Sequence, residues 1–219
     1  MAITRKTYPG FTIVELTIAL TFIAILLLFI VTITMQATAA FNKGLALKSI
    51  NQASRTIVDQ ISNDIAASAT VHQQSIGTTG GVLCTDAAVY YWNTIPSLES
   101  PSSYWAIKYK APHIEDKVYL VRTTNAQCPP ASATTWDVLD YPGTGATNKT
   151  SELLGGFSGV IDIKVDDTQK PLFRISVVLG TTKTDMYETP ALNACAPGRL
   201  GEFCARTDFT RIVYAPRAS

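Results

Sequence analysis

Charged side chains are scarce in this sequence, and motifs typical of enzymes are missing. Of its 219 residues, 16% are charged, and the formal net charge at pH 7 is +1. A chain with this balance carries no broad basic surface, so we expect no nucleic acid as its main partner. It contains neither a Gly-x-Ser-x-Gly motif nor a phosphate-binding glycine loop. We therefore expect that the protein is not an enzyme and carries no cofactor.

Metal-binding patterns are absent as well. The two histidines, His72 and His113, have no recognisable partner motif, and an isolated histidine is more often a surface or packing residue than a ligand. No Cys-x-x-Cys spacing of a zinc site occurs. Asp162, Asp166 and Asp167 lack the full acidic and glycine pattern of a calcium loop, so we interpret them as a solvated strand end. The sequence predicts no metal site.

Proline is missing between Pro9 and Pro96, and the first part of this stretch is almost free of charge. From Phe11 to Met35 the only charged residue is Glu15. About 20 consecutive apolar residues suffice to cross a bilayer as a helix, and this run is longer. A charge at the centre of such a span costs about 2.5–3.5 kcal/mol, so Glu15 requires a functional partner.

The residues Gly10-Phe11-Thr12-Ile13-Val14-Glu15, which follow a short leader with Arg5 and Lys6, resemble the class III signal of type IV pilin-like proteins. This family includes pilus subunits, minor pilins and the pseudopilins of type II secretion. The resemblance covers about residues 5–35. It implies cleavage between Gly10 and Phe11 by a membrane prepilin peptidase and N-methylation of Phe11. It also implies that Glu15 pairs with the Phe11 amine of a neighbouring subunit in a filament.

The chemistry of these residues agrees with that reading. Gly10 has no side chain to prevent an extended backbone in a protease cleft, and pairing two charges offsets the cost of burying both. Arg5 and Lys6 predict a single-pass protein of the cytoplasmic, or inner, membrane with its N-terminus inside and its head outside. The alternative is an ordinary secretory signal or a plain anchor, but a signal core has 7–15 apolar residues and precedes a small-residue cleavage site.

We expect an α+β, pilin-like fold, in which a long helix packs against an antiparallel β-sheet head. The leader is predicted at residues 1–10, the transmembrane helix at 11–35, its amphipathic continuation at 36–71 and the globular head at 72–219. Helical spacing in the second helical part predicts one apolar face, formed by Leu45, Ile50, Ala53, Ile57, Ile61 and Ile65.

The head shows strand patterns from residue 88 onward, after a predicted loop at residues 73–81. Alternating side chains predict strands at Ala88–Trp92, Tyr104–Lys110, Lys117–Arg122, Gly159–Val165, Leu172–Leu179 and Thr207–Tyr214. We expect Ile161, Ile163 and Val165 to share one face, and Asp166–Pro171 to form a hairpin loop. Irregular stretches are predicted at residues 93–103, 124–156 and 181–206, where any surface ligand would bind. We expect the aromatic residues Tyr90, Tyr91, Trp92, Tyr104 and Trp105 to be core rather than a binding face.

All four cysteines lie beyond the predicted span, as expected for an exported domain. Four cysteines allow three pairings. We favour the two local closures, Cys84–Cys128 and Cys195–Cys204; the second resembles the C-terminal disulfide of many pilin-like proteins. Four free thiols remain the alternative.

Three functions are compatible with this sequence. The first is a structural, minor subunit of a type IV pilus-like filament, whose partners are prepilin peptidase, other pilin subunits and, before assembly, the membrane. The segment Asp59–Ala66 is similar to the helix of minor pilins and pseudopilins of the PilW and PulJ type. The second is a type II secretion pseudopilin, and the third is a pilus-borne adhesin that binds a surface ligand through its head loops.

Overall fold

The computed structural model describes residue 10 and residues 12–130, 136–142, 149–188, 192–196 and 203–216. The chain divides into two compact units, Met1–Phe41 and Asn42–Ser219. One long helix, α1 at Ile13–Ala67, begins in the first unit and ends in the second. In the second unit this helix packs against antiparallel β-sheets, so the fold class is α+β, as predicted.

Ten strands and four helical segments make up the described chain. After α1, the elements are β1 Val71–Ile76, β2 Gly80–Thr85, β3 Val89–Asn93, α2 Ile95–Glu99, η1 Ser102–Tyr104, β4 Ile107–Tyr109, β5 Leu120–Thr124, β6 Trp136–Leu139, β7 Lys149–Leu154, β8 Ser158–Gln169, β9 Leu172–Thr181, η2 Thr184–Met186 and β10 Arg206–Tyr214.

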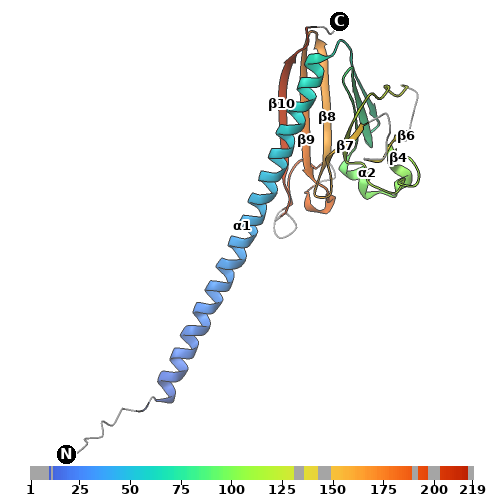
Figure 1. The fold of residues 1–219 in the computed structure, drawn as a ribbon. Coiled ribbons are helices and arrows are strands. Elements are labelled where there is room, and N and C mark those ends of the chain that lie inside the picture. Colours follow the sequence, from blue (N-terminus) through green and yellow to red (C-terminus); the bar gives the residue numbers. More distant parts are fainter. Residues whose placement is uncertain are drawn as a thin grey trace, which may run out of the picture. The chain divides into compact units, whose positions relative to one another are not determined.

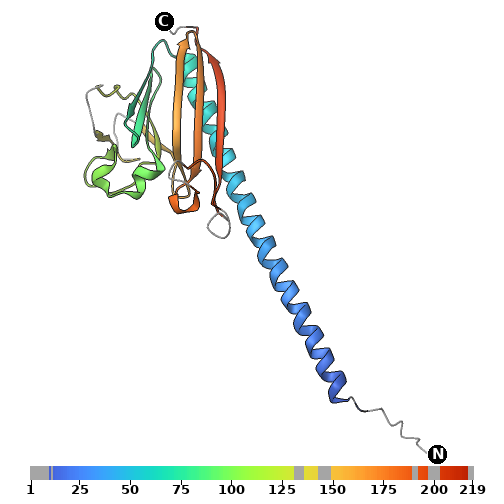
Figure 2. The same ribbon diagram turned by 180° about the vertical axis from the view of Figure 1, so that it is seen from behind.

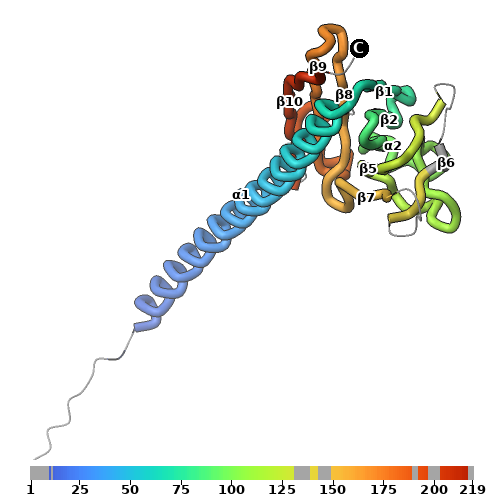
Figure 3. The backbone as a smooth tube through the Cα atoms, turned by 45° about the horizontal axis from the view of Figure 1, so that its top comes forward, coloured from blue at the N-terminus to red at the C-terminus, as the bar shows by residue number. Residues whose placement is uncertain are grey.

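The strands form three sheets rather than the one that we expected. A five-stranded antiparallel sheet has the order β1-β2-β3-β5-β7, and a three-stranded antiparallel sheet has the order β10-β9-β8. The third is the parallel pair of β4 and β6. Figures 1 and 2 show the end of α1 on one face of the three-stranded sheet, and Figure 3 shows the five-stranded sheet beside β8.

The C-terminal part of α1 joins the two larger sheets in one core. Its residues Ile50, Ile57, Ile61 and Ile65 are fully buried, as the helical spacing predicts. They pack with Leu83, Tyr90 and Leu120 of the five-stranded sheet and with Phe173, Ile175, Val177 and Leu179 of β9. The predicted face is wrong at one position, because Leu45 is 50% exposed and its neighbour Ala46 is buried.

Polar contacts set the position of the helix along this core. Asp64 accepts hydrogen bonds from Arg122 Nε at 2.9 Å, from the second guanidinium nitrogen at 3.1 Å and from the Tyr90 hydroxyl at 2.5 Å. The Asp64 carboxylate raises the pKa of Arg122, and burial followed by the bond to Asp64 raises the pKa of Tyr90. A two-pronged, partly buried ion pair of this kind fixes orientation as well as distance.

A second row of contacts joins α1 to the edge strand β10. Thr207 donates to Asn51 at 2.8 Å, Phe209 lies under the guanidinium of Arg55, and Arg211 forms an ion pair with Asp59. The helix residues are four apart and the strand residues two apart, and both spacings advance about 6 Å along their elements. The matched rise lets three successive pairs form between α1 and β10.

The predicted loop at residues 73–81 is too long, because β1 ends at Ile76 and β2 begins at Gly80, which leaves a turn at residues 77–79. The helix also ends at Ala67 rather than near residue 71. Every residue of β2 and β3 is buried, because one face of their sheet packs on α1 and the other on β4 and Leu139. A strand that is buried on both faces has no polar alternation by which the sequence would reveal it.

The three predicted irregular stretches contain regular elements. Residues 93–103 include α2 and η1, residues 124–156 include β6 and β7, and residues 181–206 include η2 and the start of β10. The predicted loop Asp166–Pro171 is shorter than expected, since β8 extends to Gln169.

The predicted face of β8 is also partly wrong. A register shift between Val160 and Asp162 turns Ile161 away from Ile163, so that Val160 takes its place in the core. Such a bulge inserts one residue and changes the side-chain alternation, which periodicity alone does not reveal.

Candidate functional site

The first part of α1 presents an uninterrupted apolar surface. Its large side chains from Ile13 to Met35 are 45% or more exposed within the described chain. The most apolar window of the helix has a mean hydropathy of 2.9, and none of it is buried. A soluble monomer rarely exposes a continuous apolar patch of this size. The described residues therefore contain one helix long and apolar enough to cross a membrane.

The helix begins with a reciprocal cap formed by Thr12 and Glu15. The Thr12 carbonyl accepts the first helical hydrogen bond, from Leu16 N at 3.1 Å. The Glu15 carboxylate accepts from Thr12 N at 3.0 Å and from the Thr12 hydroxyl at 2.8 Å, and Glu15 N donates back to that hydroxyl at 3.3 Å. This is a capping box, in which the two residues satisfy donors that would otherwise lack partners at the start of a helix.

The capping box gives Glu15 a local partner that we did not infer from the sequence. Its carboxylate lies at the positive end of the helix dipole, where a negative charge is favourable. Because Glu15 is only the third helical residue, it lies at the end of the apolar run and not at its centre. The spacing Thr-x-x-Glu immediately before an apolar run was the signal that could have identified the cap.

Gly10, two residues before the cap, is accessible. Gly10 is exposed, and no heavy atom lies within 4 Å of the position that a β-carbon would take. Phe11, the predicted methylation site, and the leader residues Arg5 and Lys6 lie outside the described residues. The structure therefore shows an open backbone at Gly10 directly before a helix that starts at Ile13.

The four cysteines form two disulfides in the head, in the pairing that local closure favours. Cys84 at the end of β2 is joined to Cys128, and Cys195 is joined to Cys204, each with a Cα–Cα distance of 5.7 Å. The first disulfide spans 44 residues and the second spans nine.

Other candidate residues have structural partners. Tyr90, Tyr91, Trp92 and Trp105 are buried, whereas Tyr104 is 66% exposed and does not belong to the core that we expected. His113 stacks on Tyr141 and contacts Asp116 at 2.8 Å, and His72 lies exposed on β1. Within the described residues, no three histidine, cysteine or acidic side chains are arranged to hold a metal ion.

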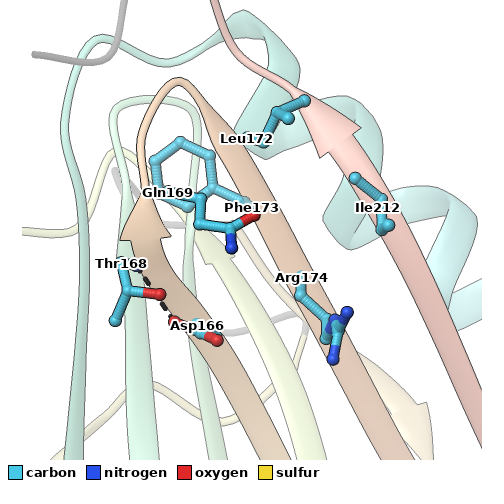
Figure 4. Close-up of a pocket in the computed structure, with 7 residues that line it drawn as sticks. All are labelled: Asp166, Thr168, Gln169, Leu172, Phe173, Arg174 and Ile212. Carbon is cyan, nitrogen blue, oxygen red and sulfur yellow. Dashed lines mark hydrogen bonds between the residues drawn. The ribbon is translucent and has the colours of Figure 1, made fainter.

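A shallow pocket lies near the turn between β8 and β9 (Figure 4). Asp166 at its edge accepts a hydrogen bond from Thr168 N at 3.0 Å, and this bond holds the pKa of Asp166 below its ordinary value. Leu172 and Ile212 add exposed apolar surface beside Arg174. The pocket measures about 120 Å³, and ligand sites usually measure about 300–1,000 Å³, so it is too small for a typical ligand.

Comparisons with known proteins identify no relative of this chain. No protein-family model, no curated protein and no solved structure matches it. The long apolar N-terminal helix and the antiparallel sheets are compatible with a pilin-like fold.

Proposed function

We propose that this protein is a minor structural subunit of a type IV pilus-like filament. It is inserted into the inner membrane, cleaved after Gly10 by prepilin peptidase, methylated at Phe11 and assembled through its N-terminal helix. The head, which follows the helix, faces away from the cytoplasm and is finally extracellular. The proposal includes no catalytic step.

The observation that carries this proposal is the combination of a continuous apolar helix surface with one carboxylate at its start. The apolar side chains need a bilayer before assembly and the helices of other subunits afterwards, and the 55-residue α1 can serve both purposes. In the free subunit, Glu15 is satisfied by Thr12. In a filament, the new amine of a neighbouring Phe11 would replace or supplement that partner with an opposite charge.

The absence of a break in α1 favours a minor subunit over a subunit of the filament shaft. No proline occurs in the helix, and its only glycine, Gly44, lies beyond the apolar run. Glycine and proline are the residues that most readily interrupt a helix, so nothing in this span favours local unwinding. The helix can therefore enter a filament without unwinding, and this favours a minor subunit over a subunit of the shaft.

The N-terminus of the mature protein tests the proposal. We expect protein purified from its native host to begin with N-methyl-phenylalanine at Phe11, as measured by intact mass and N-terminal analysis. Gly10→Val places a branched side chain at the scissile bond, so the variant should keep its leader and remain in the membrane fraction. Gly44→Val, outside the signal, serves as the matched control and should be cleaved.

Two results would contradict this function. One is a mature wild-type chain that retains Met1 or begins after Ala37–Ala40. The other is cleavage of the Gly10→Val chain at the same bond, followed by normal assembly.

A further inference from the structure

A cavity of about 450 Å³ lies between the two larger sheets, where β8 and the start of β10 approach the β1–β2 turn and the end of β3. We call it the Arg206 cavity. Its lining includes Ser75, Thr78, Trp92, Asp162, Asn193 and Arg206. The volume falls in the range of sites for small molecules. The cavity does not involve the N-terminal helix surface used in filament assembly.

Arg206 is the unusual member of this lining. Its Nε atom is buried and has no hydrogen-bond partner, and its guanidinium takes part in no ion pair among the described residues. Buried donors in folded proteins are nearly always paired, and an unpaired one needs an explanation. An arginine cannot escape this cost by losing its proton.

The polar side chains near Arg206 make contacts with other residues. The Asp162 carboxylate lies 2.7 Å from Lys164 Nζ, and Asp208, on the same sheet face, accepts from Ser176 at 3.5 Å. The Tyr187 hydroxyl lies over Gly180, the β9 partner of Arg206, and donates to Thr181 O at 3.0 Å. Arg206 lines the cavity and none of these contacts involves its guanidinium, so its charge has no partner among the described residues.

The charges and hydrogen-bonding groups of the cavity define that ligand. Arg206 and Lys164 provide two positive charges against the one negative charge of Asp162, so the lining has a net positive charge. A guanidinium presents parallel N–H donors that match the two oxygens of a carboxylate. Hydroxyl and amide side chains of Ser75, Thr78 and Asn193 are suited to the hydroxyl groups of a sugar. We propose that the Arg206 cavity binds an acidic saccharide, with the carboxylate on Arg206.

The proposal is tested with glucuronate as the probe and the full-length, disulfide-bonded protein in detergent micelles. We expect saturable binding by calorimetry and a shift of the Arg206 Nε–H resonance in nitrogen–proton spectra. Arg206→Gln should weaken binding at least tenfold. Arg174→Gln removes an arginine that lies elsewhere on the same sheet, opposite Asp166, and should leave binding unchanged. Circular dichroism and non-reducing peptide maps confirm that both variants are folded.

Asn193→Ala is a second test that leaves Arg206 in place, and we expect it to weaken glucuronate binding several-fold without affecting acetate. Glucose and acetate separate the two parts of the ligand. Weaker binding of both than of glucuronate supports the assignment. Binding of glucose as tight as that of glucuronate would overturn the role of the carboxylate, and equally tight acetate would overturn the saccharide. Absence of saturable glucuronate binding to the wild type, or full binding by Arg206→Gln, would overturn the site itself.

Discussion

At the scale of single residues, Glu15 combines two roles, and a substitution to an apolar residue would remove both at once. Its carboxylate caps α1 together with Thr12, and in our proposal it also pairs with a neighbouring amine. Removing a cap costs about 0.5–2 kcal/mol, whereas breaking a buried ion pair costs about 3–5 kcal/mol. The second effect is larger, so charge should dominate assembly.

Glu15→Gln and Thr12→Val separate these roles. Glutamine can form the same capping box without a charge, so Glu15→Gln should keep its helix content but be recovered poorly in sheared filaments. Thr12→Val keeps the carboxylate and loses the hydroxyl, so it should assemble better than Glu15→Gln. The measurement compares filament and membrane fractions of both variants with the wild type. Equal filament recovery for Glu15→Gln and the wild type would exclude the charge-pairing role.

At the scale of secondary structure, the junction from α1 to β1 depends on Asp86 in the turn after β2. Its Oδ2 atom accepts from Ala69 N at 2.6 Å and Thr70 N at 3.2 Å, and its Oδ1 accepts from the Thr70 hydroxyl. The hydroxyl of Thr70, followed by the backbone N–H groups of Ala69 and Thr70, lowers the pKa of Asp86. The helix therefore ends where the carboxylate of Asp86 can accept hydrogen bonds from the backbone N–H groups that follow it.

This contact predicts acid sensitivity. Because the pKa of Asp86 is lower in the folded than in the unfolded state, its stabilisation is complete above the ordinary pKa of about 3.9 and is lost as pH falls through the folded value. Asp86→Asn should unfold at lower urea concentration at pH 7 and lose less stability than the wild type below pH 4. Asp167→Asn is the control, since Asp167 only approaches Lys170 at 3.7 Å. An equal loss of stability with falling pH in the wild type and in Asp86→Asn would contradict the assignment.

At the scale of the whole molecule, the head is held by several packed layers. One core joins α1 to the two larger sheets, a second joins the five-stranded sheet to β4 and Leu139, and a third surrounds Ile95 and Tyr187. The disulfides belong to the outer two cores, because Cys84 lies in the second and Cys204 in the third. Each disulfide is therefore anchored at one cysteine outside the main core.

The two disulfides should differ in their contribution to stability. Loop entropy predicts about 4 kcal/mol for a 44-residue closure and about 2.5 kcal/mol for one of nine residues. Replacing both Cys84 and Cys128 by serine should therefore lower the urea midpoint of the full-length protein more than the double replacement of Cys195 and Cys204. A larger loss from the second pair would show that packing, and not loop closure, determines the difference.

The sequence by itself determined the features that depend on local composition. The apolar run and the absence of proline were sufficient to predict α1. Clean alternation was sufficient for the inward face of β9, because the other face of its first half, up to Ser176, is exposed or half-buried. The cysteine spacing was sufficient to favour the two disulfides. The processing signal around Gly10 and Glu15 stays a prediction, because Phe11 and the leader lie outside the described residues.

Only the tertiary structure decided the features that depend on what packs on both sides of an element. β2 showed no alternation because both of its faces are buried, and the bulge in β8 moved Val160 into the place expected for Ile161. Ala46 replaced Leu45 in the core because the orientation of a helix follows from the sheets that it contacts. Arg206 looked like an ordinary strand residue in the sequence; only the tertiary structure shows that its Nε is buried and unpaired and that it lines a cavity with β8 and the β1–β2 turn.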